Sequence, residues 1–190
     1  MRNTCGLSNV TLAYLEEYEK ILQEMMHEMS EVPITCSLSD NFIKQMIPHH
    51  IAAIKMSENI LRYTTNIGVQ NLALCIIKEQ EESIEKIKAM QERCCYFQNS
   101  QYEVYDYMFG FIEIAEIMFY DMCSAPISNS VNVNFLQEMI VHHIGAIQMA
   151  QNILRFSICQ ELIPILQCMI QTQGEQIELM QKILNDVSDC

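Results

Sequence analysis

Apolar side chains recur every three or four residues along this chain. In the first segment, five of them share one helical face: Leu15, Tyr18, Leu22, Met25 and Met29. Because an α-helix turns once every ~3.6 residues, this spacing predicts an amphipathic helix with one buried face. Pro33 follows and ends the helix.

Two more helices are predicted downstream. The apolar stripe of the second consists of Phe42, Met46, His49, Ala53, Met56, Ile60 and Tyr63. Ser39 is the predicted N-cap of this helix, and Pro48 lies inside it, at a position where proline can bend a helix. The third helix is expected from about Val69 to Cys94. Its buried face is predicted to contain Ala73, Ile77, Gln80, Ile84 and Ile87.

The same pattern occurs twice. Residues 41–62 and 134–155 are identical at 14 of 22 positions, and the offset of 93 residues continues without gaps well outside them. A match of this length indicates a duplicated structural unit. By this offset Asn132 is the second copy's predicted N-cap. The sequence therefore predicts an all-α protein of two tandem three-helix repeats, residues 1–97 and 98–190, joined near 94–102 and packed as one globular unit.

Composition supports this fold class. The 190 residues include only 5 Gly and 4 Pro, too few for the many turns of a β-sandwich or β-barrel. The formal net charge of −13 makes nucleic acid an improbable partner and favours cations. No apolar run is long enough to cross a membrane. Self-association stays open.

The cellular compartment follows from two weaker signals. The first residues, Met1 to Gly6, lack the basic and apolar segments of a signal peptide, so the cytoplasm is expected unless a leader has been removed. The nine cysteines are odd in number and sparse for a disulfide scaffold, so reduced thiols are expected.

Candidate chemistry lies on the second helix of each repeat. His49-His50 and His142-His143 interrupt the apolar stripes, and the same helices carry methionines about one turn before and nearly two turns after each pair. Antiparallel packing of the three helices would bring methionines of the first and third helices to the same level. One cluster per repeat is predicted, and its members are Met25, Met29, Met46, His49, His50 and Met56, then Met118, Met122, Met139, His142, His143, Met149 and Met180.

Thioether and imidazole ligands suit a soft monovalent ion such as Cu(I) or Ag(I). A purely structural role for these side chains stays open, because methionines often fill cores and buried histidines often serve only as polar core groups. Gln80 and Gln173 lie on apolar faces, where each amide bonds either to a histidine ring or to backbone or water. A di-iron site is disfavoured, since Glu24 and His27 form a single Glu-x-x-His half-motif.

A match to a known family is carried by two segments, MIPHHIAAIKM and MIVHHIGAIQMA. The chain resembles the family catalogued as domain of unknown function 305, whose signature is Met-Ile-Pro-His-His followed by Ala-Ile-x-Met. Residues 173–180 also fit that family's later Gln-x-x-Glu-Ile-x-x-Met helix, except that Gln176 replaces the Glu. Copy one departs further, with Ser83 and Ile87 at the matching places.

This resemblance covers both copies and implies a ferritin-like helical bundle. Some family members bind copper through Met and His. The positions carried over are Met46, His49, His50 and Met56, with Met139, His142, His143, Met149 and Met180. The resulting hypothesis is a non-enzymatic protein that sequesters or buffers Cu(I) or Ag(I). The alternative is a structural or assembly bundle without metal, in which the histidine pairs are core polar groups.

Overall fold

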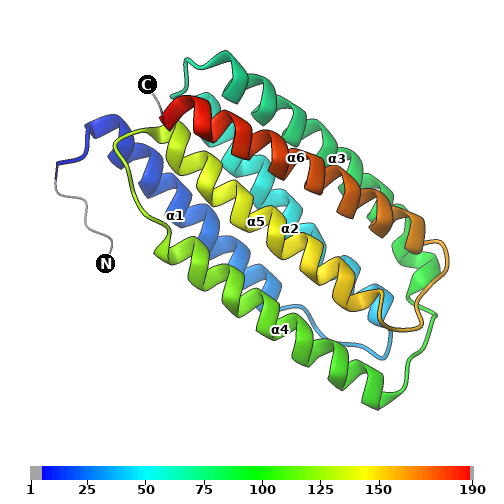
Figure 1. Ribbon diagram of the computed structural model, residues 1–190. Helices are drawn as coiled ribbons and strands as arrows, with labels where there is room; N and C mark the ends of the chain where they lie inside the picture. Colours follow the sequence, from blue (N-terminus) through cyan, green and yellow to red (C-terminus); the bar gives the residue numbers. More distant parts are fainter. Residues whose placement is uncertain (1–5, 189–190) are drawn as a thin grey trace.

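The computed structural model describes residues 6–188, and these residues form six helices (Figure 1). The helices are α1 (Asn9–Ser30), α2 (Leu38–Leu61), α3 (Ile67–Cys94), α4 (Gln101–Ser124), α5 (Val131–Ile153) and α6 (Ile163–Ser188). The predicted all-α fold of two three-helix repeats is confirmed. Residues 1–5, which include most of the segment used to judge a leader, lie outside the described residues. None of the described helices is long and apolar enough to cross a membrane.

The starts of α2 and α5 lie two residues before the predicted positions. Ser37 and Ser130, rather than Ser39 and Asn132, are the N-caps, and each hydroxyl accepts a hydrogen bond from the backbone N–H three residues later. The prediction was wrong because several adjacent polar residues satisfy the capping rule equally well. Ser39 instead accepts a hydrogen bond from the backbone N–H of Cys159 (3.0 Å).

Within each repeat the three helices alternate in direction. Asn59 near the end of α2 donates a hydrogen bond to the carbonyl of Tyr14 near the start of α1 (3.0 Å), and Asn152 bonds Tyr107 in the same way (3.0 Å). The hydroxyl of Ser37 at the start of α2 donates to the carbonyl of Cys94 at the end of α3 (3.0 Å). These contacts confirm the antiparallel order predicted for the helices of each repeat.

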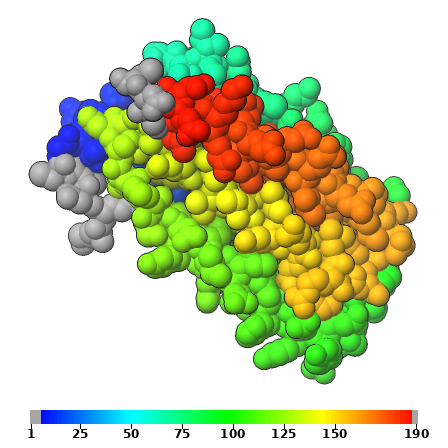
Figure 2. All heavy atoms as spheres, viewed as in Figure 1, coloured from blue at the N-terminus to red at the C-terminus, as the bar shows by residue number. Residues whose placement is uncertain are grey.

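The two repeats meet through α2 and α5, which lie side by side at the centre of the bundle (Figure 1). Buried apolar residues from both repeats form one core. Two matching tyrosines cross between the repeats: Tyr14 donates to the buried carboxylate of Glu138 (2.7 Å), and Tyr107 donates to the amide oxygen of Gln45 (2.7 Å). In the space-filling view, α4, α5 and α6 share one face of the molecule (Figure 2).

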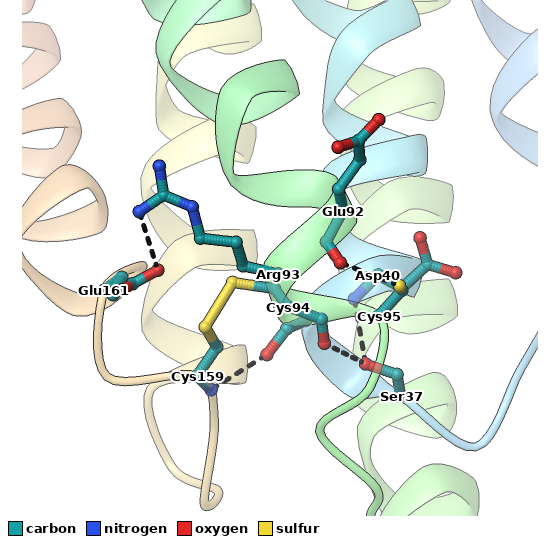
Figure 3. The surroundings of a disulfide bond; sticks show 9 residues. Ser37, Asp40, Glu92, Arg93, Cys94, Cys95, Cys159 and Glu161 are labelled. Carbon is teal, nitrogen blue, oxygen red and sulfur yellow. Dashed lines mark hydrogen bonds and ion pairs between the residues drawn. A yellow bond between two sulfur atoms is a disulfide. The ribbon is translucent and has the colours of Figure 1, made fainter.

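A disulfide joins Cys94, the last residue of α3, to Cys159 in the loop before α6 (Figure 3). The expectation of reduced thiols is therefore wrong for these two residues. Cysteine count and density carry no information about which loops the fold brings together, and here the two Cα atoms lie 5.4 Å apart across 65 residues of sequence. An ion pair between Arg93 and Glu161 (3.5 Å) lies beside the bond.

Candidate functional site

Four histidines form a buried cluster where α2 and α5 cross. His49, His50, His142 and His143, hereafter the histidine quartet, are at most 1% exposed. The rings of His49 and His142 stack with centroids 3.7 Å apart, and these residues are related by the 93-residue offset. They therefore lie at the approximate two-fold axis between the repeats. The sequence predicted one cluster per repeat, whereas the structure brings both histidine pairs into a single quartet.

Burial keeps the quartet uncharged. Loss of water lowers the pKa of His50 to about 3 and that of His143 to about 4. The same desolvation, together with repulsion from neighbouring imidazoles, lowers the pKa of His49 and His142 well below the ordinary value of 6.5. At neutral pH each ring is therefore a neutral imidazole, with one N–H and one lone-pair nitrogen.

The hydrogen bonds of repeat two identify which nitrogen carries the proton. His142 donates from Nε2 to the carbonyl oxygen of His49 (3.1 Å). His143 Nε2 bonds Oε1 of Gln176 (2.7 Å), and Nε2 of Gln176 donates to the carboxylate of Glu79 on α3 (2.7 Å). Because a carboxylate accepts only, Glu79 fixes the amide orientation, and His143 must donate from Nε2. The lone pairs of both rings are thus on Nδ1.

Repeat one is less constrained. His50 Nε2 bonds the hydroxyl of Ser83 (3.0 Å), which can act as donor or acceptor. Neither ring nitrogen of His49 has a hydrogen-bond partner, and Nδ1 of His50 and Nδ1 of His142 also lack one. A buried polar atom without a partner costs about 1–3 kcal/mol and is uncommon. The quartet therefore presents several lone pairs that the protein itself does not satisfy.

The nine predicted methionines are all buried in the core around these helices, with at most 3% exposure. They are Met25, Met29, Met46, Met56, Met118, Met122, Met139, Met149 and Met180. The sulfur of Met118 packs directly against Gly145, two residues after His143, where an added Cβ would overlap it. Repeat one has Ala52 at the position matching Gly145. The thioether of Met118 therefore contacts the segment of α5 that follows the histidines of repeat two.

Hard-metal sites are not formed by the described part of the chain. Among residues 6–188, no three His, Cys, Asp or Glu side chains converge in a way that could hold a metal ion. Glu24 and His27, the half-motif of a di-iron site, are exposed, and Glu24 pairs with Lys55 (2.6 Å). Zinc and di-iron centres need three or more such ligands, so the di-iron hypothesis loses its support here.

The residues that bond the outer rings differ from those considered in the sequence. Gln80 and Gln173 are buried, and their Oε1 atoms have no hydrogen-bond partner. Ser83 and Gln176, one helical turn later, bond the outer rings. The predicted face of α3 and α6 was right, but the sequence repeat does not show which side chain on that face is long enough to reach a histidine ring.

A cleft lies between α3 and α6. Its volume is about 430 Å³, and its lining includes Gln80, Ser83, Gln173 and Gln176. Ser83 and Gln176 contact the cleft on one side and the rings of His50 and His143 on the other. These two side chains therefore separate the quartet from the cleft.

Comparison with known proteins gives one family and one fold. The sequence model of the family described as "Domain of unknown function (DUF305)" matches residues 19–99 and 120–184. The fold is similar to "CopM in the Ag-bound form", with a TM-score of 0.58, 21% identity, and coverage of 80% of this chain and 98% of that one. It is also similar to a DUF305 fragment from Deinococcus radiodurans (TM-score 0.56, 23% identity, coverage 78% and 95%). No curated protein matches.

Proposed function

The chain belongs to the DUF305 family, and from that premise and the histidine quartet we propose that it binds Cu(I) or Ag(I) and sequesters or buffers the ion without catalysing a reaction. The observation that carries the proposal is the set of buried Nδ1 atoms without hydrogen-bond partners. Because a neutral imidazole offers a lone pair and adds no charge, it suits a soft monovalent cation.

The donor set favours a soft ion over a hard one. The thirteen candidate ligands are the quartet and the nine buried methionines, which supply only imidazole nitrogen and thioether sulfur. In a core without three converging His, Cys, Asp or Glu side chains among the described residues, sulfur must complete any coordination shell. Thioethers select Cu(I) and Ag(I) over Zn²⁺, Mg²⁺ and Ca²⁺.

The structural neighbour adds support of a different kind. The solved structure of CopM was obtained in a silver-bound form, and it shares this fold over most of both chains. Silver is a soft monovalent ion, so this neighbour agrees with the donor chemistry inferred from the quartet. The acidic net charge of −13 would also attract a cation to the protein.

The alternative, in which the histidines are only core polar groups, fits less well. Polar groups kept in a core for structural reasons are normally hydrogen-bonded. His49 has no partner on either ring nitrogen, although it is fully buried. A structural role alone leaves this cost unexplained.

The test is competition titration of the purified protein with Cu(I) against a chelator of known affinity, repeated with Ag(I). We expect saturable binding that His142→Ala/His143→Ala weakens by more than about tenfold. The variant His49→Ala/His50→Ala measures the contribution of repeat one. Met108→Leu changes a methionine outside the predicted set and should leave the affinity unchanged.

A thermal melt distinguishes binding to the folded protein from binding elsewhere. An ion that binds only the native state raises the unfolding midpoint as its concentration rises. Weak binding that is equal in the wild type and both double variants, with no shift of the midpoint, would sink the proposal. It would favour the structural alternative, particularly if the double variants also lost stability.

A further inference from the structure

Helix α4 exposes a row of large apolar side chains to solvent. The exposed fractions range from 48% to 77% for Tyr102, Tyr105, Phe109, Ile112 and Tyr120. At about 100° per residue these five side chains fall within an arc of about 80°, hereafter the α4 stripe. In Figure 2 the green side chains of α4 project from the outer edge of the molecule. Isolated exposed apolar residues are common, but several large ones on one helix face usually mark a binding surface.

The duplication supplies an internal control for this surface. The residues of α1 that match the stripe at the 93-residue offset are Asn9, Leu12, Glu16, Glu19 and His27. Both helices occupy the same place in their repeat, each packed against the central helix of that repeat. Apart from Leu12, which is 38% exposed, this outer face is polar. A largely polar outer face therefore suffices for the fold, so folding alone does not account for the aromatic face of α4.

Charge decides which kind of partner fits. Glu113 and Glu116 are exposed near the middle of α4, in or beside the stripe. Between Arg93 and Arg155 the chain contains no Lys or Arg. If two α4 helices paired antiparallel about their midpoints, the four carboxylates would meet without a neighbouring cation, and like charges repel. A second copy of this chain is thus a poor partner for the α4 stripe.

We propose that the α4 stripe binds an amphipathic helix of a partner protein whose apolar face carries Lys or Arg at its centre. Aromatic residues on the stripe would supply the contact area, as they do in many interfaces. The basic residues would meet Glu113 and Glu116, which would set the register and orientation of the partner helix. This interaction is independent of the proposed metal binding, because the stripe lies on the outer face of the bundle.

The test uses a synthetic, fluorescently labelled amphipathic peptide of about 18 residues, with a leucine stripe and two central lysines. A twin peptide carries glutamate in place of both lysines. We expect the lysine peptide to bind the full protein at least about tenfold more tightly than its twin. The variant Phe109→Glu/Ile112→Glu, which copies Glu16 and Glu19 of α1, should lose this binding while keeping the wild-type melting midpoint. Glu16→Gln/Glu19→Gln is the matched control and should bind like the wild type.

Four outcomes would overturn the proposal. Two are direct: equal binding of the two peptides, or undiminished binding to Phe109→Glu/Ile112→Glu. The third is a concentration-dependent dimer in sedimentation that this variant abolishes, which would make a second copy the occupant. The fourth is binding to phosphatidylcholine vesicles that the same variant abolishes, which would make the stripe a membrane contact.

Discussion

The two repeats hold their outer histidines in different ways. In repeat two, His143 is bonded by Gln176, which is itself held by Glu79 of the other repeat. In repeat one, His50 is bonded only by the hydroxyl of Ser83. An amide held by a carboxylate fixes which ring nitrogen keeps its lone pair, whereas a hydroxyl can rotate and accommodate either tautomer. The duplication thus kept all four rings and changed what orients them.

This difference extends to the surrounding ligands and to the pKa values. Repeat two has buried Met180 where repeat one has buried Ile87, so it offers one more thioether. The hydrogen bond that His143 donates to Gln176, together with one to the backbone of Met139, opposes the lowering of the His143 pKa, which is about 4, compared with about 3 for His50. Repeat two is therefore the half in which the rings are better ordered, and we expect the stronger metal site there.

The largest expected effect is acid unfolding. The pKa of each quartet histidine is lower in the folded protein than in the unfolded chain, so the unfolded state binds more protons below about pH 6.5. Stability is then unaffected above that pH and falls as the pH drops toward the folded pKa values. At pH 5 this loss is about 2 kcal/mol each for His50 and His143, whose folded pKa values are about 3 and about 4, and His49 and His142 add to it in the same direction. Urea unfolding at a series of pH values measures this loss.

The two repeats can be separated in the same experiment. His142→Asn/His143→Asn should halve the dependence on pH between about 6.5 and 4, because two of the four protonations disappear. His49→Asn/His50→Asn should do the same, because it also removes two of the four protonations. An unfolding free energy that is independent of pH from 7 to 5 in the wild type would show that the rings are not buried as neutral groups.

The second-largest expected effect concerns the disulfide between Cys94 and Cys159. By the 93-residue offset, Cys94 corresponds to Val187 and Cys159 to Asn66, so the disulfide has no symmetric counterpart. Closing a loop of 65 residues stabilises a protein by about 4 kcal/mol in the chain-entropy account. Cys94→Ser/Cys159→Ser should lower the unfolding free energy by about this amount, as measured by urea denaturation.

A control makes the result specific to the cross-link. Cys95→Ser changes an adjacent free thiol and should leave the stability unchanged within about 0.5 kcal/mol. Adding a reductant should destabilise the wild type to the level of the double variant. If the double variant and the reduced wild type were as stable as the oxidised protein, the disulfide would have no role in holding α3 to the loop before α6.

Most of the fold could be predicted from the sequence because the apolar spacing is nearly regular. The predicted stripe residues Phe42, Met46, Ala53 and Ile60 are all buried. The residues 93 positions later in the second repeat are buried as well. What could not be predicted was how the repeats face each other, since a repeat pattern defines each copy but not their contact. The stacking of His49 on His142 depends on that contact.

The same limit explains two features that the sequence did not indicate. Cys94 and Cys159 belong to different repeats, as do Tyr14 and the buried Glu138. The spacing of residues within one copy does not indicate either contact. The substitution of Ser83 by Gln176 at matching positions was visible in the sequence. Its consequence was not, because it required knowing that Gln176 faces Glu79 across the cleft.

The smallest effect comes from making repeat two resemble repeat one. Gln176→Ser replaces the oriented amide with a hydroxyl and leaves Glu79 without its amide donor, which should cost about 1–2 kcal/mol of stability. It should also lower the pKa of His143 further, because the hydrogen bond that raises it is lost. Titration of the ring by NMR and urea unfolding measure the two effects.

The reciprocal variant, Ser83→Gln, places an amide beside His50 but faces Thr172, the residue matching Glu79, so no carboxylate fixes its orientation. We therefore expect Gln176→Ser to weaken Cu(I) binding about tenfold and Ser83→Gln to strengthen it little. Equal affinities in the wild type and Gln176→Ser would mean that ring orientation does not distinguish the two halves, and the extra thioether of Met180 would then have to carry the difference.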